Sequence, residues 1–425
     1  KICIINTDNV PNNGSVIRGH VLKNAEKYNV DEAGEGRDFV NFLQTKVAFL
    51  NSMVDRITSS RPDSNGLVPL CEPLPKKALV ICDEGKDLPL WMSDGAVQHK
   101  FGVKIRHNPK DLESDIALKL RVANGTHTAV AHAMALLSLV NTEALCSSST
   151  SAKVILAYLD SLYQTQFFPA AVNDDISAEE TNATWEDWRQ RLQHPHFGLS
   201  TFFITQNGAA KCGIRLGPTI KSLITASDCD AAKVDHPLSV SMAFAVACIL
   251  RFLTPVSSAN KSASCDWQER IDDAKRRGVY VGWLDAAGYN NDSNSDGDQS
   301  SVDTTVTYAD GLRYNLREGW YEFRCDCPIR LSAPTRVERE IALPEALSTC
   351  VYEEVIRSYL LHPQGGNLQT VLVGDDEEEK LMRARKFDTF VSAVSTLCSR
   401  MVSWDNVIDI LQEMASKQNI YADGF

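Results

Sequence analysis

The segment from Ala117 to Val140 constrains the fold most, because it is almost wholly apolar and carries a few polar residues at helical spacing. It reads ALKLRVANGTHTAVAHAMALLSLV. A helix that is apolar on nearly every side is typical of a protein core. From Asp111 onward the apolar spacing predicts a mainly helical body. The predicted helices are Asp111–Val140, Ala152–Phe168, Ala178–Leu192, Pro218–Ala226, Leu238–Leu253, Trp267–Arg277 and a closing region Phe387–Met414.

The front of the chain differs, because short apolar runs alternate with turn residues there. KICIIN at Lys1–Asn6 predicts a buried strand, and TDNVPNNG after it is turn chemistry. Further predicted elements are a helix at 15–28, an apolar stretch at 46–53, strands at 78–82 and 102–105, a loop at 290–303, a small β-hairpin element at 306–331 and a helix start at 374–380. The fold class is therefore mainly α, with a little α/β at the front.

Charge and cysteine usage exclude several function classes. The chain of 425 residues has 43 Lys and Arg against 55 Asp and Glu, a net charge of −12, which is the wrong sign for nucleic acid or an anionic membrane. No apolar run approaches the roughly 20 residues of a membrane span. Twelve scattered cysteines without a Cys-x-x-Cys pair favour reduced thiols and no metal site. We expect a cytoplasmic protein with no nucleic-acid or membrane partner.

Three polar residues of the apolar segment are candidates for catalysis. At about 100° per residue, Asn124 lies about 140° and His127 about 80° from Lys119, so the three share one side of an α-helix. Burial lowers the pKa of a lysine and supplies a neutral amine, as a general base requires. An Asn amide can hold an oxyanion, and a His can orient a hydroxyl. From spacing alone, the favoured interpretation is that these are ordinary core residues on one helix.

Asp8 and Asn9 follow the front strand directly. The carboxyl edge of an open α/β sheet is where ligands bind. An Asp and Asn turn with ordinary side-chain to backbone bonds is the other interpretation, and the segment alone does not choose between them.

Four segments together resemble the long-chain polyol dehydrogenases, a family that includes mannitol 2-dehydrogenase, fructuronate reductase and tagaturonate reductase. TDNVPNNGSVIRGHVL is similar to the family's Cys-Asp-Asn-x-Pro-x-Asn-Gly stretch, and NSMVDRIT to its Met-Val-Asp-Arg-Ile-Thr segment. KLRVANGTH matches its Lys-x4-Asn-x2-His signature, and NGAAKCGIRLGP its later Gly-x-x-Lys stretch. The order and spacing agree over residues 1 to about 255.

The resemblance implies an NAD(P)-dependent oxidoreductase that moves a hydride between nicotinamide and a secondary alcohol or ketone of a polyol or hexuronate. Residues 1–80 would be the C-terminal remnant of a Rossmann NAD(P)-binding domain. Residues 81–425 would form the mostly helical catalytic domain, with an insertion around 267–350. The partner would be a small polyol or sugar acid, and the protein a monomer or weak dimer.

The resemblance also implies a role for each matching residue. Lys119 would be the general base, Asn9 and Asn124 would hold the reacting oxygen, and His127 would bind the substrate. Asp55 and Lys211 would be substrate-binding residues, and Asp8 and Asn9 would contact the cofactor, NAD or NADP. The mechanism needs no metal.

Two departures keep alternatives open. Mannitol dehydrogenases carry an Arg where this chain has Phe203, so a substrate other than free mannitol is expected. No G-x-G-x-x-G turn follows a strand, so most of the cofactor-binding domain is expected to lie upstream, and weak NAD(P)H binding is expected of the chain itself. One alternative is a non-catalytic sugar-binding or scaffold protein that lost cofactor binding. Another is a polyol-phosphate dehydrogenase with Arg215 and Lys221 near the phosphate.

Overall fold

The fold is given by a computed structural model in which two compact units are distinguished. Unit 1 contains Lys1–Lys119 and Glu186–Phe197, and unit 2 contains Leu120–Trp185 and Gly198–Phe425. The assignment of residues 1–80 to a cofactor-binding domain stays a prediction. The described residues are 1–27, 35–56, 58–59, 70–71, 76–137, 139, 141–194, 198–199, 201–205, 211–226, 238–253, 305–307, 312–315, 320–323, 330–332, 353, 356–357, 359–362, 365–374, 376–401 and 407–415.

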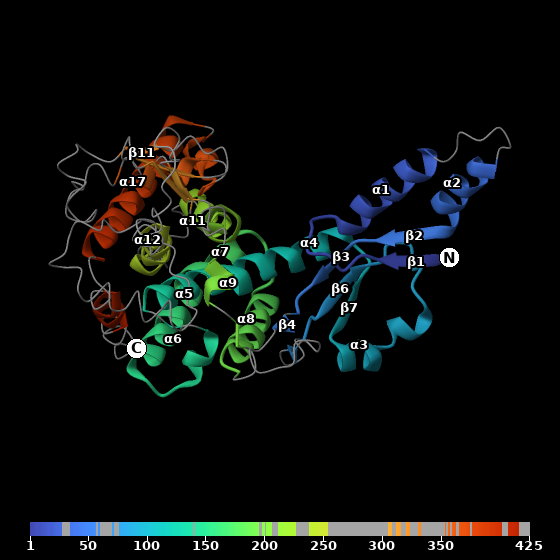
Figure 1. The fold of residues 1–425 in the computed structure, drawn as a ribbon, viewed down its shortest axis with the longest axis horizontal. Coiled ribbons are helices and arrows are strands. Elements are labelled where there is room, and N and C mark those ends of the chain that lie inside the picture. Colours follow the sequence, from blue (N-terminus) through green and yellow to red (C-terminus); the bar gives the residue numbers. More distant parts are fainter. Residues whose placement is uncertain are drawn as a thin grey trace, which may run out of the picture. The chain divides into compact units, whose positions relative to one another are not determined.

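Unit 1 begins with a parallel strand pair and two helices, of which the sequence predicted the first strand and the first helix. Strand β1 (Ile2–Ile5) pairs with β2 (Val47–Leu50), and helices α1 (Asn13–Lys27) and α2 (Glu35–Lys46) lie between them along the chain (Figure 1). Parallel neighbours need such a crossover. The apolar residues Ala25, Leu43 and Val47 pack together where α1, α2 and β2 meet.

A second sheet of unit 1 supports helix α4. Its strands are β3 (Ser52–Val54), β6 (Leu79–Cys82) and β7 (Val103–Arg106), in the order β3-β6-β7. Met53, Val80 and Cys82 of this sheet pack against Leu112 of α4. The remaining elements are β4 (Thr58–Ser59), β5 (Leu70–Cys71), η1 (Leu90–Ser93), α3 (Gly95–Phe101) and α4 (Pro109–Leu118).

Unit 2 is built around helix α5 (Asn124–Leu136), which is buried from Gly125 to its end. It packs against α6 (Thr150–Leu162), α9 (Thr201–Thr205), α12 (Val240–Leu253) and η5 (Cys212–Leu216). The almost wholly apolar sequence of α5 suits this position, since every side of the helix meets protein.

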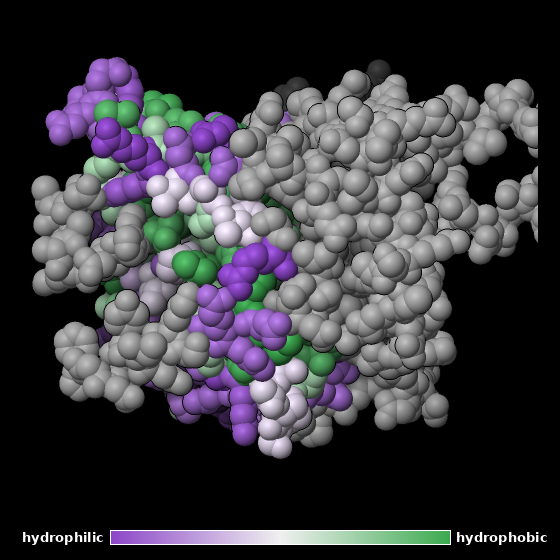
Figure 2. Space-filling model, turned by 90° about the vertical axis from the view of Figure 1, so that its left-hand side faces the viewer, coloured by the Kyte–Doolittle hydropathy of each residue, from purple (hydrophilic) through white to green (hydrophobic). Residues whose placement is uncertain are grey.

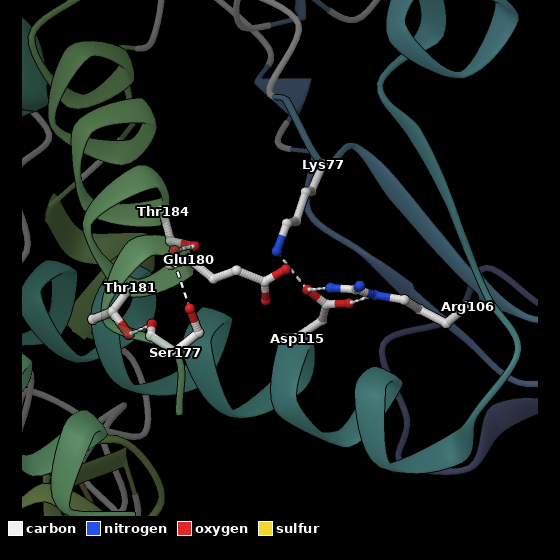
Figure 3. A network of polar contacts seen from close by, with 7 residues as sticks. All are labelled: Lys77, Arg106, Asp115, Ser177, Glu180, Thr181 and Thr184. Carbon is white, nitrogen blue, oxygen red and sulfur yellow. Dashed lines mark hydrogen bonds and ion pairs between the residues drawn. The ribbon is translucent and has the colours of Figure 1, made fainter. Parts of the chain in front are cut away.

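The other helices of unit 2 begin where polar caps predict. Asp376 accepts a hydrogen bond from the Glu379 N–H at 2.7 Å at the start of α17 (Glu377–Arg400), which confirms the predicted acidic helix start. Ser177 caps α8 (Ala178–Leu192) through the Glu180 N–H (Figure 3). The remaining elements are η3 (Thr142–Cys146), η4 (Tyr163–Phe167), α7 (Phe168–Asn173), α11 (Gly217–Thr225), η9 (Gln369–Leu372) and a helix at 407–415.

The predicted β-hairpin element is a four-stranded antiparallel sheet in the order β11-β10-β9-β8. Its strands are β8 (Thr305–Thr307), β9 (Leu312–Asn315), β10 (Trp320–Phe323) and β11 (Arg330–Ser332). The predicted helix Trp267–Arg277 and the predicted loop 290–303 lie outside the described residues.

One helix prediction was wrong in a way that matters for the site. The segment 111–140 is not one α-helix, because a π-helical turn, η2 (Lys119–Ala123), separates α4 from α5. The angles of 100° per residue therefore do not hold between Lys119 and Asn124. Further π-helical turns are η4 and η5. Such turns are rare and often lie at functional sites, and η5 directly follows Lys211.

Candidate active site

Lys119 is the last residue of the first of the two segments that make up unit 1. It is nearly buried, with 9% of its surface exposed. Helix α4, which carries it, is capped by the Asn108 side chain and has Pro109 in its first turn. The Lys119 Nζ donates to Asn9 Oδ1 at 3.0 Å and to the Val54 carbonyl at 2.5 Å. Both of these acceptors are uncharged. A neutral amine held in this way can accept a proton from a hydroxyl.

The loop that carries Asn9 is fixed by the fully buried side chain of Asn13. The Asn13 Nδ2 donates to the carbonyls of Asn6 at 2.8 Å, Asp8 at 2.9 Å and Ser52 at 3.0 Å. Its Oδ1 accepts from the Ser52 N–H at 2.8 Å. One amide therefore ties the turn after β1 to strand β3, whose Val54 carbonyl also receives Lys119.

Asp8 and Asp55 have different surroundings. Asp8 is exposed, and its carboxylate accepts from the Asn9 N–H at 2.8 Å, as in the ordinary turn interpretation. The Asp55 carboxylate accepts from Arg191 Nη1 at 2.9 Å. Arg191 is 4% exposed, and its Nη1 also lies 3.4 Å from Asp187 Oδ2. Asp55 is thus held in place by a buried cation of the same unit.

Asn124 and His127 belong to unit 2. Asn124 is half-buried at the first position of α5, and its carbonyl accepts from Thr128 Oγ1 at 2.8 Å. His127 is 3% exposed. Both residues therefore lie in the first turn or so of helix α5, which directly follows η2 in the chain.

Two half-buried cations of unit 2 lie close to α5. Lys211 Nζ donates to the Ile204 carbonyl at 2.6 Å, and Arg215 Nη1 donates to Thr128 Oγ1 at 2.8 Å. Burial, and then the charge of Arg215, lowers the pKa of Lys211 to about 7. Burial also lowers the pKa of Arg215 to about 10. Burial lowers the pKa of the nearby His132 to about 3, against the hydrogen bond to the Thr128 carbonyl, which raises it, and with a smaller lowering contribution from the charges of Lys211 and Arg215.

Within the described residues, neither Lys211 nor Arg215 forms an ion pair with a carboxylate. Two cations one helical turn apart without a counter-charge attract an anion. This pair can therefore receive a carboxylate or a phosphate.

The known proteins to which this chain is similar are polyol dehydrogenases. No family model matches the chain. A curated mannitol 2-dehydrogenase from Cereibacter sphaeroides is 28% identical over 176 residues. The resemblance to the long-chain polyol dehydrogenases is confirmed. The match covers 39% of this chain and 32% of the relative, so the chain spans about a third of the length of that relative.

Two solved structures of polyol dehydrogenases are also similar. One is a Pseudomonas fluorescens mannitol 2-dehydrogenase in a ternary complex with NAD and D-mannitol, with a TM-score of 0.41 and 19% identity over 60% of this chain and 48% of that one. The other is a D-sorbitol dehydrogenase in substrate-free form, with a TM-score of 0.41 and 18% identity over 58% and 47% of the two chains.

The structure brings some of the residues implied by the polyol dehydrogenase resemblance together. Lys119 and Asn9 are hydrogen-bonded in unit 1, and Asp55 directly follows Val54, whose carbonyl holds Lys119. Asn124, His127 and Lys211 lie in unit 2. Sequence reasoning missed the Val54 carbonyl and the buried Arg191. A backbone acceptor leaves no trace in a side-chain motif, and a single Arg in the segment DWRQRL gives no signal of its own.

Other features do not compete with this site. In the described ranges, no group of three His, Cys, Asp or Glu side chains is placed to hold a metal ion. Among the same residues, no helix combines the length and apolarity needed to cross a membrane.

Unit 2 also has a cavity of about 480 Å³ between α6, α12, α17 and the helix 407–415. Its charged lining residues, Arg400 and Glu413, pair with one another at 2.5 Å, so it offers no base or free cation. The face of the molecule shown in Figure 2 carries hydrophobic residues bordered by hydrophilic ones.

Proposed function

We propose that the chain acts as an NAD(P)-dependent oxidoreductase on a secondary alcohol or ketone of a polyol or hexuronate, with Lys119 as general base. The observation that supports this most is the Lys119 amine, nearly buried and placed 3.0 Å from Asn9 Oδ1. A base and an oxygen-binding amide side by side are what alcohol oxidation requires of the protein. The 28% identity to a mannitol 2-dehydrogenase agrees with this proposal.

In the oxidising direction, Lys119 takes the proton of the reacting hydroxyl. The Asn9 amide donates to the oxygen as it gains negative charge. The resemblance to the polyol dehydrogenases implies that Asn124 also holds the reacting oxygen and that His127 binds the substrate. A nicotinamide held near Asp8 and Asn9 would supply the hydride acceptor. Holding these groups in place in advance is the main contribution of the protein, since the donors then need no rearrangement as charge develops.

The described residues fit only part of the cofactor. Asp8 and Asn9 are exposed beyond the carboxyl end of β1, where we place the nicotinamide end. The first N–H groups of α1 are occupied, because the Gly14 N–H donates to Asn13 Oδ1 and the Ser15 N–H to Asn51 Oδ1. The Gly14 and Ser15 N–H groups are therefore not available to a pyrophosphate at that helix N-terminus.

Lys211 and Arg215 favour an anionic substrate within this class. A hexuronate carboxylate would supply the counter-charge that the described residues do not give the pair, and a polyol phosphate is the alternative anion. We therefore propose a keto-uronate in preference to free mannitol.

A non-catalytic sugar-acid binder is the second candidate, supported by the occupied N–H groups of α1. The two are separated by assaying reduction of fructuronate and tagaturonate and oxidation of mannitol and sorbitol, with both NAD(H) and NADP(H). Calorimetry with the same compounds is run in parallel. Turnover of a keto-uronate about tenfold better than mannitol supports the proposal, since one unmatched polar group costs about that factor. Binding without turnover supports the second candidate, and neither binding nor turnover contradicts both.

A further inference from the structure

The carboxylate of Asp115 is enclosed by two cations in unit 1, and its side chain has no exposed surface. Lys77 Nζ donates to Asp115 Oδ1 at 2.6 Å. Arg106 donates to the same carboxylate through Nε at 2.7 Å and through Nη2 at 3.1 Å. Figure 3 shows the two cations reaching the carboxylate of Asp115 on α4 from different segments of the chain.

This cluster joins α4 to two strands. Arg106 is the last residue of β7, and Lys77 stands two residues before β6. A two-pronged guanidinium contact fixes direction as well as distance. Burial tends to raise the pKa of the Asp115 carboxyl, but the hydrogen bonds from Arg106 and Lys77 outweigh it, so the pKa lies below its ordinary value. The carboxylate therefore stays charged and keeps both cations.

The same elements determine where the Lys119 amine lies. The Lys119 N–H donates to the carbonyl of Asp115, so the two residues are bonded through the helix backbone. The Val54 carbonyl, which receives Lys119 Nζ, belongs to β3, and Val54 pairs with Leu79 of β6. The cluster thus anchors both partners, the helix that carries Lys119 and the sheet that receives it.

We propose that Asp115 is a positioning residue for Lys119: by clamping α4 to β6 and β7 it holds the Lys119 amine against Val54 and Asn9. The catalytic meaning of this placement rests on the proposed function, whereas the placement itself is testable without turnover.

The test is competitive acylation of lysines in the whole protein with limiting acetic anhydride, read by mass spectrometry. Lys110 on the same helix is exposed and serves as the internal reference. In Asp115→Asn, acylation of Lys119 relative to Lys110 should rise about fivefold, the factor that corresponds to one net hydrogen bond. The matched control is Asp111→Asn, which removes the same charge from the exposed first turn of α4 and should leave the ratio unchanged.

Asp115→Asn leaves two half-buried cations with less compensation, so Arg106→Lys is tested beside it. This variant keeps the charge but loses the two-pronged contact, and it should raise the acylation ratio in the same direction. Where turnover is measurable, kcat should fall with little change in KM. Circular dichroism identifies the variants that remain folded. If acylation of Lys119 relative to Lys110 in those variants stays within twofold of the wild type, the proposal is overturned, even if their melting temperature falls. Absence of turnover in the wild type would count against the proposed function. The acylation test would remain valid, because it does not depend on turnover.

Discussion

Lys119 and Lys211 are held in different ways. Two uncharged acceptors, Asn9 Oδ1 and the Val54 carbonyl, hold Lys119 nearly buried at the end of α4. Lys211 donates to the Ile204 carbonyl and has Arg215 as a charged neighbour. Burial, and then the charge of Arg215, lowers the pKa of Lys211 to about 7. A lysine that titrates near neutrality responds to any anion placed beside it, so the binding of a sugar acid should be visible as a proton movement.

That proton movement has a definite sign. At pH 8 the Lys211 amine is mostly neutral, because its pKa is about 7. A bound carboxylate favours the charged form and raises the pKa, so Lys211 should take up a proton on binding D-glucuronate. Affinity should accordingly weaken as the pH rises from 7 to 9. Calorimetry in two buffers of different ionisation enthalpy measures the uptake.

Mannitol carries no charge and should cause no uptake. Lys211→Met should abolish the uptake, whereas Lys221→Met, an exposed lysine on the neighbouring helix α11, should keep it. Proton uptake that persists in Lys211→Met would show that another group receives the anion.

At this scale the sequence supplied candidate residues but not their neighbours. The Lys-x4-Asn-x2-His pattern and the Asp-Asn turn pointed to Lys119 and Asn9, which the structure joins by a hydrogen bond. The pairing of Asp55 with Arg191 could not be predicted, because the two residues are far apart in the chain and neither belongs to a periodic pattern with the other.

At the scale of elements, apolar periodicity predicted where helices lie but not how they are wound. The apolar run 117–140 is equally compatible with α and π hydrogen bonding, so the turn at Lys119–Ala123 carries no sequence signal. The strands β1 and β6 were predicted because short apolar runs stood between turn residues. Strand β7 was predicted from a weaker pattern, in which Lys104 interrupts the apolar residues Val103 and Ile105. The pairing of β3 with β6 depends on distant contacts, which single-sequence patterns do not encode.

Helix α1 offers a prediction about packing, because two of its glycines differ in their surroundings. A Cβ on Gly14 would stand 2.4 Å from the carbonyl carbon and oxygen of Leu50, both backbone atoms of β2. Gly14→Ala should therefore force α1 away from the sheet and lower the free energy of unfolding by about 1–3 kcal/mol. Gly19 has nothing within 4 Å, so Gly19→Ala should instead raise it by about 0.5–1 kcal/mol through helix propensity.

Urea denaturation of both variants measures the two changes. Equal stabilisation by Gly14→Ala and Gly19→Ala would mean that α1 does not lie this close to β2.

At the scale of the whole molecule, the candidate residues are distributed over two compact units. Unit 1 contributes Lys119, Asn9 and Asp55, and unit 2 contributes Asn124, His127 and Lys211. The helical periodicity predicted the mainly α character of the chain. The boundary at Lys119 was beyond prediction, because the segment that crosses it reads as one uninterrupted apolar helix.

The central claim is that Lys119 is the base of an NAD(P)-dependent oxidoreductase, and one measurement tests it most directly. The turnover of Lys119→Ala is compared with that of the wild type and of Lys110→Ala, an exposed lysine on the same helix. The account predicts that kcat falls by about two to four orders of magnitude in Lys119→Ala only, with the fold intact and part of the rate restored by added methylamine. A Lys119→Ala protein that turns over its substrate at the wild-type rate would contradict the account.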